Sequence, residues 1–264
     1  MTAVLAAALG AGASVWAVQR SGHPAHSSTT PSTASGPVAV AASAGSQSAA
    51  ATATDSLSPQ GHPKQPPDGL SLGSTSPAVF ALQQRLVGLG YWIGTPDGVF
   101  GDSTEQAVYA YQKAAGVGAD GVVGPVTQAA LAQGVVPTPR STSGYVIEVN
   151  LERDLLLVVQ DGKVQEILNT STGGGYTYTS DGITAVAQTP TGQFQIYRQV
   201  DGMVTDSLGQ LWRPKFFDGG FAIHGDSYVP PGPVSHGCVR VSNEAIDWIW
   251  ANNVLPMGAS VLVY

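Results

Sequence analysis

The sequence predicts an α+β fold, in which a small three-helix module precedes a mostly β, sandwich-like or barrel-like domain. Three observations support this prediction. Apolar residues recur at spacings of three and four over residues 76–133, as on one face of an amphipathic helix. Residues 144–264 instead contain short β-rich runs and a tight Asp-Gly turn. Residues 21–75 are almost entirely Ser, Thr, Ala, Pro, Gly, Gln and His, a composition that cannot bury a core.

The N-terminal residues 1–20 contain an uncharged, largely apolar run that ends before Arg20. Such a run suits the core of a signal peptide, and Val15-x-Ala17 fits a small-residue cleavage pattern. The run also reaches the short limit for a membrane-spanning helix, so a retained membrane anchor is the alternative. We therefore expect an exported protein of the cell envelope, with residues 21–75 as a disordered linker.

Three helices are expected in the module. The first covers residues 76–89, where an N-terminal Ser-Pro pair provides the cap and the first turn. The second covers residues 102–115, with Asp102 at its start and Glu105 as the partner of a capping box. The third covers residues 125–132, and residues 134–143 then link the module to the β-rich domain.

The turns that precede the second and third helices repeat. Asp97-Gly-Val-Phe-Gly-x-x-Thr104 matches Asp120-Gly-Val-Val-Gly-x-x-Thr127. The Asp-Gly pair forms the turn, and the second glycine frees the backbone before the helix. By itself, the repeat indicates a compact helical unit whose two halves pack together.

Residues 76–133 resemble the peptidoglycan-binding domain, a three-helix module appended to many wall enzymes. The elements Leu-Gly-Tyr, Asp-Gly-x-Phe-Gly and Gly-Pro-x-Thr occur in the family's order. The resemblance implies binding of wall glycan or peptide in a shallow groove. A folded spacer that binds weakly is the alternative.

Composition excludes some partners and singles out one side chain. Only 11% of the residues are charged and the net charge is −7, with no basic stripe, so nucleic acid is not expected as a partner. The single cysteine, Cys238, cannot form an internal disulfide. In an exported protein a free thiol needs a reason, either chemistry or burial as a small apolar side chain.

Seven strands and one helix are expected after residue 144. The Asp161-Gly162 turn joins the second strand to the third. The expected helix covers residues 244–252. The expected strands cover residues 145–150, 155–159, 164–168, 192–197, 220–224, 238–241 and 260–263.

Within this domain, His224 is expected to end one strand and Cys238 to begin another. A thiol with an ordinary pKa of ~8.5 is mostly protonated at neutral pH, so a nucleophilic cysteine needs a histidine within hydrogen-bond reach. Backbone N–H groups around Gly237 and Cys238 could hold an oxyanion. A zinc site formed by His224, His236 and Cys238 is the alternative, although no fourth ligand accompanies them. From residue types alone, both possibilities stay open.

The pattern Ala-Ile-His-Gly followed by Ser-His-Gly-Cys-Val-Arg resembles the YkuD-type L,D-transpeptidase family. The resemblance spans residues 144–264 and includes the hairpin at 155–163, the Ser-Thr-Gly loop at 171–173 and the Thr-Pro-x-Gly strand entry at residue 189. Ten residues separate His224 from the Ser-His-Gly-Cys motif, fewer than in the commonest family spacing. A tighter loop over the thiol is therefore expected.

The resemblance assigns roles to five positions. It implies that Cys238 is the nucleophile and that His224 is its base, oriented by the backbone carbonyl of Gly225. His236, beside Gly237, would support the tetrahedral intermediate or the substrate. No metal and no organic cofactor are implied.

Five further residues are expected at the substrate. Ser235 would brace the loop, and Arg240 could hold a substrate carboxylate or form a structural salt bridge. Tyr176 lies in a long Gly-rich segment that is either a lid, an acceptor-binding loop or a mobile surface loop. Trp212 and Phe217 are expected to line the pocket, with a place in the core as the alternative.

The implied reaction is acyl transfer on peptidoglycan tetrapeptide stems. The thiolate of Cys238 would attack the carbonyl of the third residue, a diamino acid, and expel the terminal D-alanine. A side-chain amine of a second stem would resolve the thioester and form a 3→3 cross-link. The resemblance also implies inactivation by carbapenems, and we expect a monomer. The alternatives are an L,D-carboxypeptidase, in which water resolves the thioester, and a non-catalytic wall-binding protein.

Overall fold

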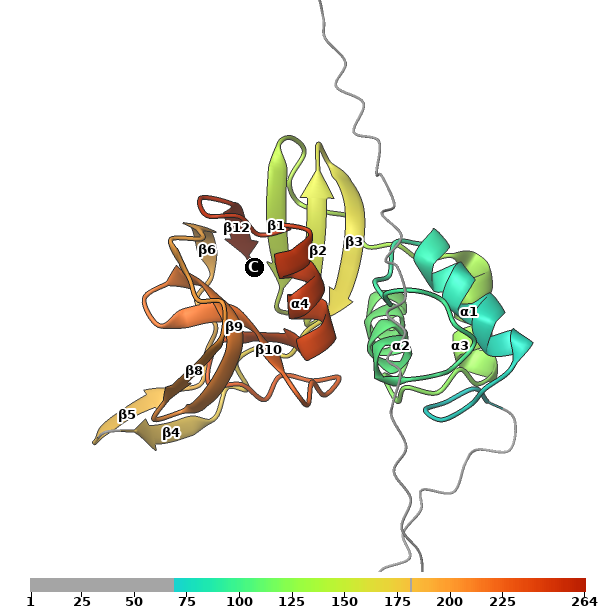
Figure 1. The fold of residues 1–264 in the computed structure, drawn as a ribbon, viewed down its shortest axis with the longest axis horizontal. Coiled ribbons are helices and arrows are strands. Elements are labelled where there is room, and N and C mark those ends of the chain that lie inside the picture. Colours follow the sequence, from blue (N-terminus) through green and yellow to red (C-terminus); the bar gives the residue numbers. More distant parts are fainter. Residues whose placement is uncertain (1–68, 181) are drawn as a thin grey trace, which may run out of the picture. The chain divides into compact units, whose positions relative to one another are not determined.

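The structure is a computed structural model that describes residues 69–180 and 182–264 (Figure 1). These residues belong to one compact unit. The expected signal peptide or anchor, and most of the expected linker, lie outside the described residues. In the described part of the chain, a three-helix module precedes a mostly β domain, which confirms the predicted α+β class. None of its helices is both long and apolar enough to cross a membrane.

The module contains α1 (Pro77–Gly88), α2 (Asp102–Ala115) and α3 (Pro125–Gln133). The hydroxyl of Ser76 caps α1 by accepting a hydrogen bond from the amide of Val79. The predicted capping box of α2 is wrong, because the N-cap is Gly101 and no side chain caps this end. Both acidic residues of the predicted box lie inside the first turn, where they favour the helix dipole.

A buried glutamine explains the internal repeat. In each half of the module, its amide nitrogen donates to the aspartate of the Asp-Gly turn and to the threonine of the following helix, and its carbonyl oxygen accepts from the turn backbone. The two sets are Gln83 with Asp97 and Thr104, and Gln112 with Asp120 and Thr127.

The module begins before residue 76, which is the boundary that the sequence predicts. Leu70 pairs with Val123, and Thr75 pairs with Val99, as isolated β-bridges. Residues 69–75 therefore belong to the helical module and not to the linker. Composition does not reveal this, because the segment is held by backbone bonds to the two repeated turns.

The first sheet of the β domain has the strand order β3-β2-β1-β12-β6. Neighbouring strands are antiparallel, except that β1 and β12 are parallel. The strands are β1 (Tyr145–Asn150), β2 (Leu155–Gln160), β3 (Lys163–Asn169), β6 (Gly192–Gln195) and β12 (Ser260–Val263).

The second sheet has the order β11-β10-β9-β7, and β8 also pairs with β9. Strands β10 and β11 are parallel neighbours. The elements are β7 (Arg198–Gln199), β8 (Met203–Asp206), β9 (Gly209–Asp218), β10 (Phe221–Asp226), β11 (Val239–Ser242) and the helix α4 (Asn243–Ala251).

Two hairpins lie in segments for which the sequence predicts no strand. One is β8–β9, and the other is β4–β5, formed by β4 (Thr177–Ser180) and β5 (Ile183–Val186). The second hairpin occupies the long Gly-rich segment that precedes the Thr-Pro-x-Gly strand entry. Most side chains of β4–β5 are exposed, so this hairpin lacks the apolar content that marks a core strand.

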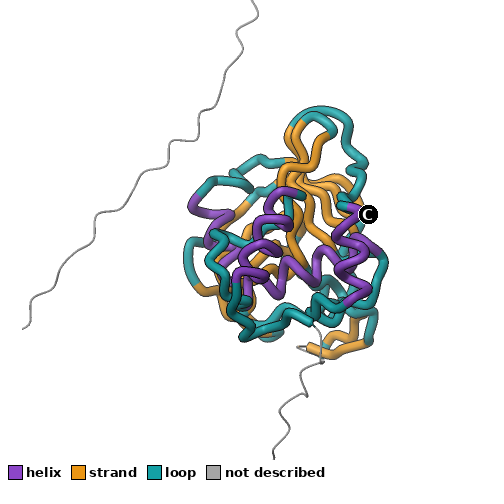
Figure 2. Tube along the Cα trace, turned by 90° about the vertical axis from the view of Figure 1, so that its right-hand side faces the viewer, coloured by secondary structure: helices purple, strands orange, loops and turns teal. Residues whose placement is uncertain are grey.

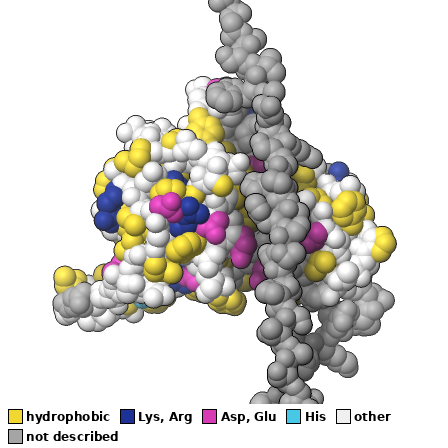
Figure 3. Space-filling view, viewed as in Figure 1, with side chains coloured by type: hydrophobic (Ala, Val, Ile, Leu, Met, Phe, Trp, Pro, Cys, Tyr) yellow, Lys and Arg dark blue, Asp and Glu magenta, His cyan; other side chains and the backbone are white. Residues whose placement is uncertain are grey.

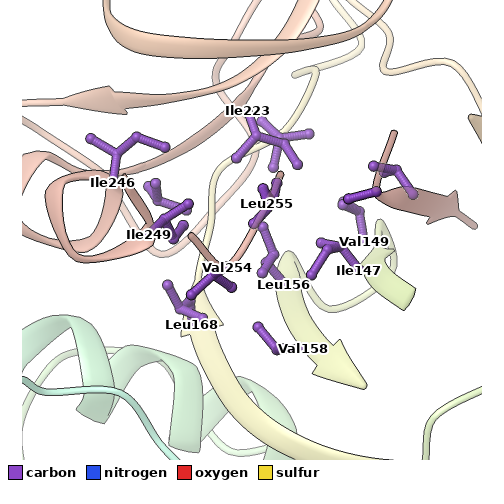
Figure 4. Packing of buried hydrophobic residues seen from close by; sticks show 14 of the residues in the cluster. Ile147, Val149, Leu156, Val158, Leu168, Ile223, Ile246, Ile249, Val254 and Leu255 are labelled. Carbon is purple, nitrogen blue, oxygen red and sulfur yellow. The ribbon is translucent and has the colours of Figure 1, made fainter. Parts of the chain in front are cut away.

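The main core lies between the two sheets and α4, which packs against β9, β10 and β11. Figure 4 shows Leu156 and Val158 of β2 in this core, together with Ile223 of β10 and Ile249 of α4. On the face that carries α4, cationic and anionic side chains lie next to one another (Figure 3). One such group is Arg213 with Asp201 and Asp247.

The opposite face of the first sheet packs against the helical module. Leu155, Leu157 and Val159 of β2 and Ile167 of β3 share a second core with the module helices. Viewed from that side, the helices lie in front of the strands (Figure 2). Strand β2 is therefore buried on both faces, which explains why its sequence is a continuous apolar run.

Candidate active site

The parallel neighbours β10 and β11 carry the two residues expected to react. His224 lies in the middle of β10, in register with Arg240 of β11, and not at the end of its strand as the sequence predicts. Cys238 lies one residue before β11, whose first residue is Val239. Both side chains line the same pocket, which has a volume of about 260 Å³.

The turn before the nucleophile is held by Ser235. Its hydroxyl donates to the carbonyl oxygen of Cys238 at 2.6 Å and accepts from the amide of Gly237 at 3.0 Å. The Gly237 amide is therefore already bonded, which is a correction to the expected oxyanion contact from this group. A side chain at Gly237 is excluded, because φ is +137° and a Cβ would lie 2.4 Å from the Phe221 ring.

His224 is buried and is oriented by the backbone. Its Nδ1 lies 2.9 Å from the carbonyl oxygen of Gly225. A carbonyl can only accept, so Nδ1 carries the proton and Nε2 is left to accept one. Burial lowers the pKa of His224, while the Gly225 carbonyl opposes this shift. A Cβ on Gly225 would lie 2.5 Å from Ile246, so glycine is required for this close packing of α4 on β10.

The thiol of Cys238 is protonated at neutral pH. Burial raises its pKa above the ordinary value, Asp206 adds to this effect, and Arg240 opposes it. In this structure the thiol donates to the carbonyl oxygen of Gly220 at 3.9 Å. The site therefore suits a mechanism in which a neutral imidazole removes the thiol proton as the sulfur attacks.

The two hairpins that the sequence does not predict form the walls of the pocket. Tyr178 comes from β4, Asp206 from β8 and Leu211 from β9. The sequence contains one kind of usable signal for them, a turn between two extended runs: Asp181-Gly182 for β4–β5 and Asp-Ser-Leu-Gly at 206–209 for β8–β9. That signal indicates a hairpin but does not indicate where the hairpin folds.

His236 is packed between tyrosine rings. Its ring centroid lies 5.5 Å from that of Tyr176 and 4.7 Å from that of Tyr178, both in edge-to-face geometry. The hydroxyl of Tyr176 donates to the carbonyl oxygen of Val234. Tyr178 lines the pocket, whereas Tyr176 supports His236 from outside it, which corrects the expectation that Tyr176 contacts substrate.

Two aromatic residues expected at the pocket lie elsewhere. Phe217 is buried in the main core, where its ring packs 5.4 Å from that of Phe194. The indole nitrogen of Trp212 donates to Asp247 of α4 at 2.8 Å. Trp212 packs against the main core and does not line the pocket. Neither residue lines the pocket, and both take the alternative place in or against the core.

Arg240 forms the salt bridge that is one of its two expected roles, and it lies where the other role is possible. Its Nε lies 3.3 Å from a carboxylate oxygen of Asp226, and its side chain also lines the pocket. The guanidinium group is partly exposed, so it can offer further donors to an anionic ligand. No group of three or more His, Cys, Asp or Glu residues within the described ranges is arranged to hold a metal ion.

Comparisons with known proteins match both parts of the chain. Residues 144–263 match the family described as the L,D-transpeptidase catalytic domain, and residues 75–131 match that of the peptidoglycan binding domain. The chain is 53% identical to the crystal structure of an L,D-transpeptidase (residues 123–326) from Xylanimonas cellulosilytica, with a TM-score of 0.73. The alignment covers 76% of this chain and 100% of that structure.

Two curated relatives match over shorter stretches. The N-acetylmuramoyl-L-alanine amidase CwlL of Bacillus licheniformis is 43% identical over 65 residues, which are 24% of this chain and 18% of that protein. The amidase CwlM of Mycobacterium tuberculosis is 47% identical over 49 residues, which are 19% of this chain and 12% of that protein. The matches thus span less than a fifth of the length of these amidases.

Proposed function

The chain belongs to the L,D-transpeptidase family, and on this basis we propose that it forms 3→3 cross-links between peptidoglycan stem peptides. One observation carries the proposal. Cys238 and His224 line one pocket, and the Gly225 carbonyl fixes the His224 tautomer so that Nε2 can accept a proton. A neutral Cys–His pair of this kind suits acyl transfer from a peptide.

The first half-reaction is acylation. His224 removes the proton from the thiol as Sγ of Cys238 bonds to the carbonyl carbon of the third stem residue. The C–N bond to the terminal D-alanine then breaks, and the imidazolium returns the proton to the leaving amine. His236 and the backbone amide of Cys238 support the negative charge on the carbonyl oxygen.

The second half-reaction transfers the acyl group. The side-chain amine of a second stem attacks the thioester, His224 accepts a proton from that amine, and the thiol leaves with the proton returned to sulfur. If water attacks instead, the product is a trimmed tripeptide stem, as in an L,D-carboxypeptidase. Arg240 is placed to bind a carboxylate of the stem.

The remaining features of the chain suit this role. A peptidoglycan-binding module would hold the enzyme at its polymeric substrate, and the expected export would place it in the cell envelope. We further propose that carbapenems acylate Cys238, because their strained carbonyl offers the same electrophile as the stem peptide. The protein acts as a monomer in this scheme.

The test is mass spectrometry of a disaccharide-tetrapeptide incubated with the full chain, beside a Cys238→Ala variant. A dimer that has lost one D-alanine, absent with the variant, is the expected result. Trimmed monomer alone would identify a carboxypeptidase. Unchanged substrate, together with no carbapenem adduct on Cys238, would contradict the proposed enzyme and favour a wall-binding protein.

A further inference from the structure

We propose that helix α2 of the wall-binding module is part of the catalytic scaffold, and that its Lys113 and Gln106 are positioning residues for the Cys238 turn. The effect on activity rests on the proposed function, whereas the contacts of the two side chains do not depend on it. The two side chains are seven residues apart and so lie on one face of α2. Each reaches a different segment that holds the catalytic strands.

Lys113 binds two backbone carbonyl groups of the β domain. Its ammonium nitrogen donates to the carbonyl oxygens of Asp154 and Thr170, both at 2.9 Å. The side chain is largely buried, and burial lowers its pKa to about 8. Burying an ammonium group costs free energy unless the group is hydrogen-bonded. Loss of either contact would therefore be costly.

The segment that Lys113 holds forms bridges to the catalytic strand. The hydroxyl of Thr170 donates to the carbonyl oxygen of Arg240 at 2.7 Å. Ser171 and Arg240 exchange backbone hydrogen bonds at 3.1 and 3.0 Å. The amide of Ser235 donates to the carbonyl oxygen of Thr172 at 2.9 Å. Residues 170–172 therefore form hydrogen bonds to the chain both before and after Cys238.

The same segment is held a second time through Asp154. The carboxylate of Asp154 accepts hydrogen bonds from both the amide and the hydroxyl of Thr172, at 3.1 and 2.5 Å. The carbonyl oxygen of Asp154 accepts from Lys113. A displacement of Lys113 thus reaches Thr172, and through Thr172 it reaches Ser235, whose hydroxyl orders the turn.

Gln106 holds the other end of the site. Its amide nitrogen donates to the carbonyl oxygen of Val229 at 3.0 Å, and its carbonyl oxygen accepts from Asn169 at 2.6 Å. Val229 lies in the ten-residue segment that runs from His224 to Ser235. The C-terminal end of α2 is also bound, because Arg153 donates to the last-turn carbonyl oxygens of Lys113 and Ala114.

A wall-binding tether would need none of these contacts. These contacts join the module to the segment that follows His224 and to the segment that holds the Cys238 turn. The module therefore contributes to turnover as well as to binding. The module-facing side chains of β2 support the same inference, since Leu155, Leu157 and Val159 share a core with the module helices.

The test uses the full chain with Lys113→Met, Gln106→Ala and the conservative Lys113→Arg, which keeps hydrogen-bond donors. Leu131→Ala is the control, because Leu131 is buried in the same module core but belongs to α3. The readouts are hydrogen exchange of the segments 170–174 and 234–238, and steady-state kcat and KM for tetrapeptide stems.

We expect Lys113→Met and Gln106→Ala to speed exchange in the catalytic segments and to lower kcat roughly tenfold or more, with KM little changed. Lys113→Arg should restore part of kcat, and Leu131→Ala should leave kcat within about twofold of the parent chain. Unchanged exchange in Lys113→Met and Gln106→Ala would overturn the inference, even if the parent chain failed to turn over stems. An active parent chain whose kcat survives both substitutions would overturn it as well.

Discussion

Burial acts on the two reacting side chains in opposite directions. It raises the pKa of Cys238 and lowers the pKa of His224, so both shifts favour the neutral pair over a thiolate–imidazolium pair. The thiol therefore reacts through deprotonation in the transition state and not as a preformed thiolate.

Alkylation kinetics test this protonation state. Because burial raises the pKa of Cys238 above its ordinary value, the thiolate fraction grows with pH across the neutral range. The rate constant for iodoacetamide should rise about tenfold per pH unit between pH 6 and about 8. The measurement is mass-spectrometric adduct formation against pH, with Cys238→Ala as the blank. A rate that is flat over this range would show a preformed thiolate.

One residue of the β4–β5 hairpin should affect catalysis more than its neighbour. Tyr178 lines the pocket and contacts His236, whereas Tyr176 contacts His236 from outside. Tyr178→Ala should lower kcat/KM for stems by about tenfold, or ~1.4 kcal/mol, because it opens the pocket wall and frees His236. Tyr178→Phe should retain most activity. Equal losses in Tyr178→Ala and Tyr176→Ala would contradict the different placement of the rings.

At the scale of the elements, the repeated turns of the module depend on a single buried amide each. Gln112 is fully buried and joins Asp120, Gly121 and Thr127. Gln112→Leu leaves buried polar partners unpaired and should lower the free energy of unfolding by about 2–4 kcal/mol. Urea denaturation measures this change. The exposed Gln133→Leu is the matched control, and a similar loss there would show a general effect of the substitution.

The packing of the whole molecule predicts that the module and the β domain unfold together. Four buried side chains of the first sheet face the module, and each contributes about 1.5–3 kcal/mol. Their sum, on the order of 6–12 kcal/mol, matches the entire stability of a typical domain. Residues 69–264 should therefore show one calorimetric transition, and residues 144–264 alone should aggregate. Two separate transitions would contradict the shared core.

The buried Lys113 also gives the whole molecule a pH-dependent stability. Its folded pKa of about 8 lies below its ordinary 10.5, so between these values the unfolded chain binds a proton that the folded chain lacks. The free energy of unfolding should then rise with pH in this window, by about 3 kcal/mol at most, relative to Lys113→Met. Burial also raises the pKa of the nearby Asp154 carboxyl, but an ordinary carboxyl titrates well below this window. Urea denaturation at pH 8 and at pH 10 measures this change for both proteins. An equal change in the free energy of unfolding for the parent chain and for Lys113→Met would contradict the pKa shift.

Most of the helices and strands that the sequence predicts correctly follow from signals between residues that are close along the chain. The three module helices and seven of the strands follow from periodicity and turn residues, which act over a few positions along the chain. The Ser-His-Gly-Cys motif likewise places its residues in one short turn. A local rule failed for the capping box at Asp102, because α2 begins at Asp102 itself and its N-cap is Gly101, which has no side chain to form the box.

Two features were decided only by the tertiary structure. The pocket walls come from two hairpins, of which β4–β5 has few apolar side chains. Trp212 and Phe217 of β9 turn toward the core, because strand register and not residue type decides which face a side chain meets. The docking of α2 joins Lys113 to Thr170, 57 positions away. Such contacts leave no periodic signal along the chain, and the unbroken apolar run of β2 finds its explanation only in the second layer that covers the sheet.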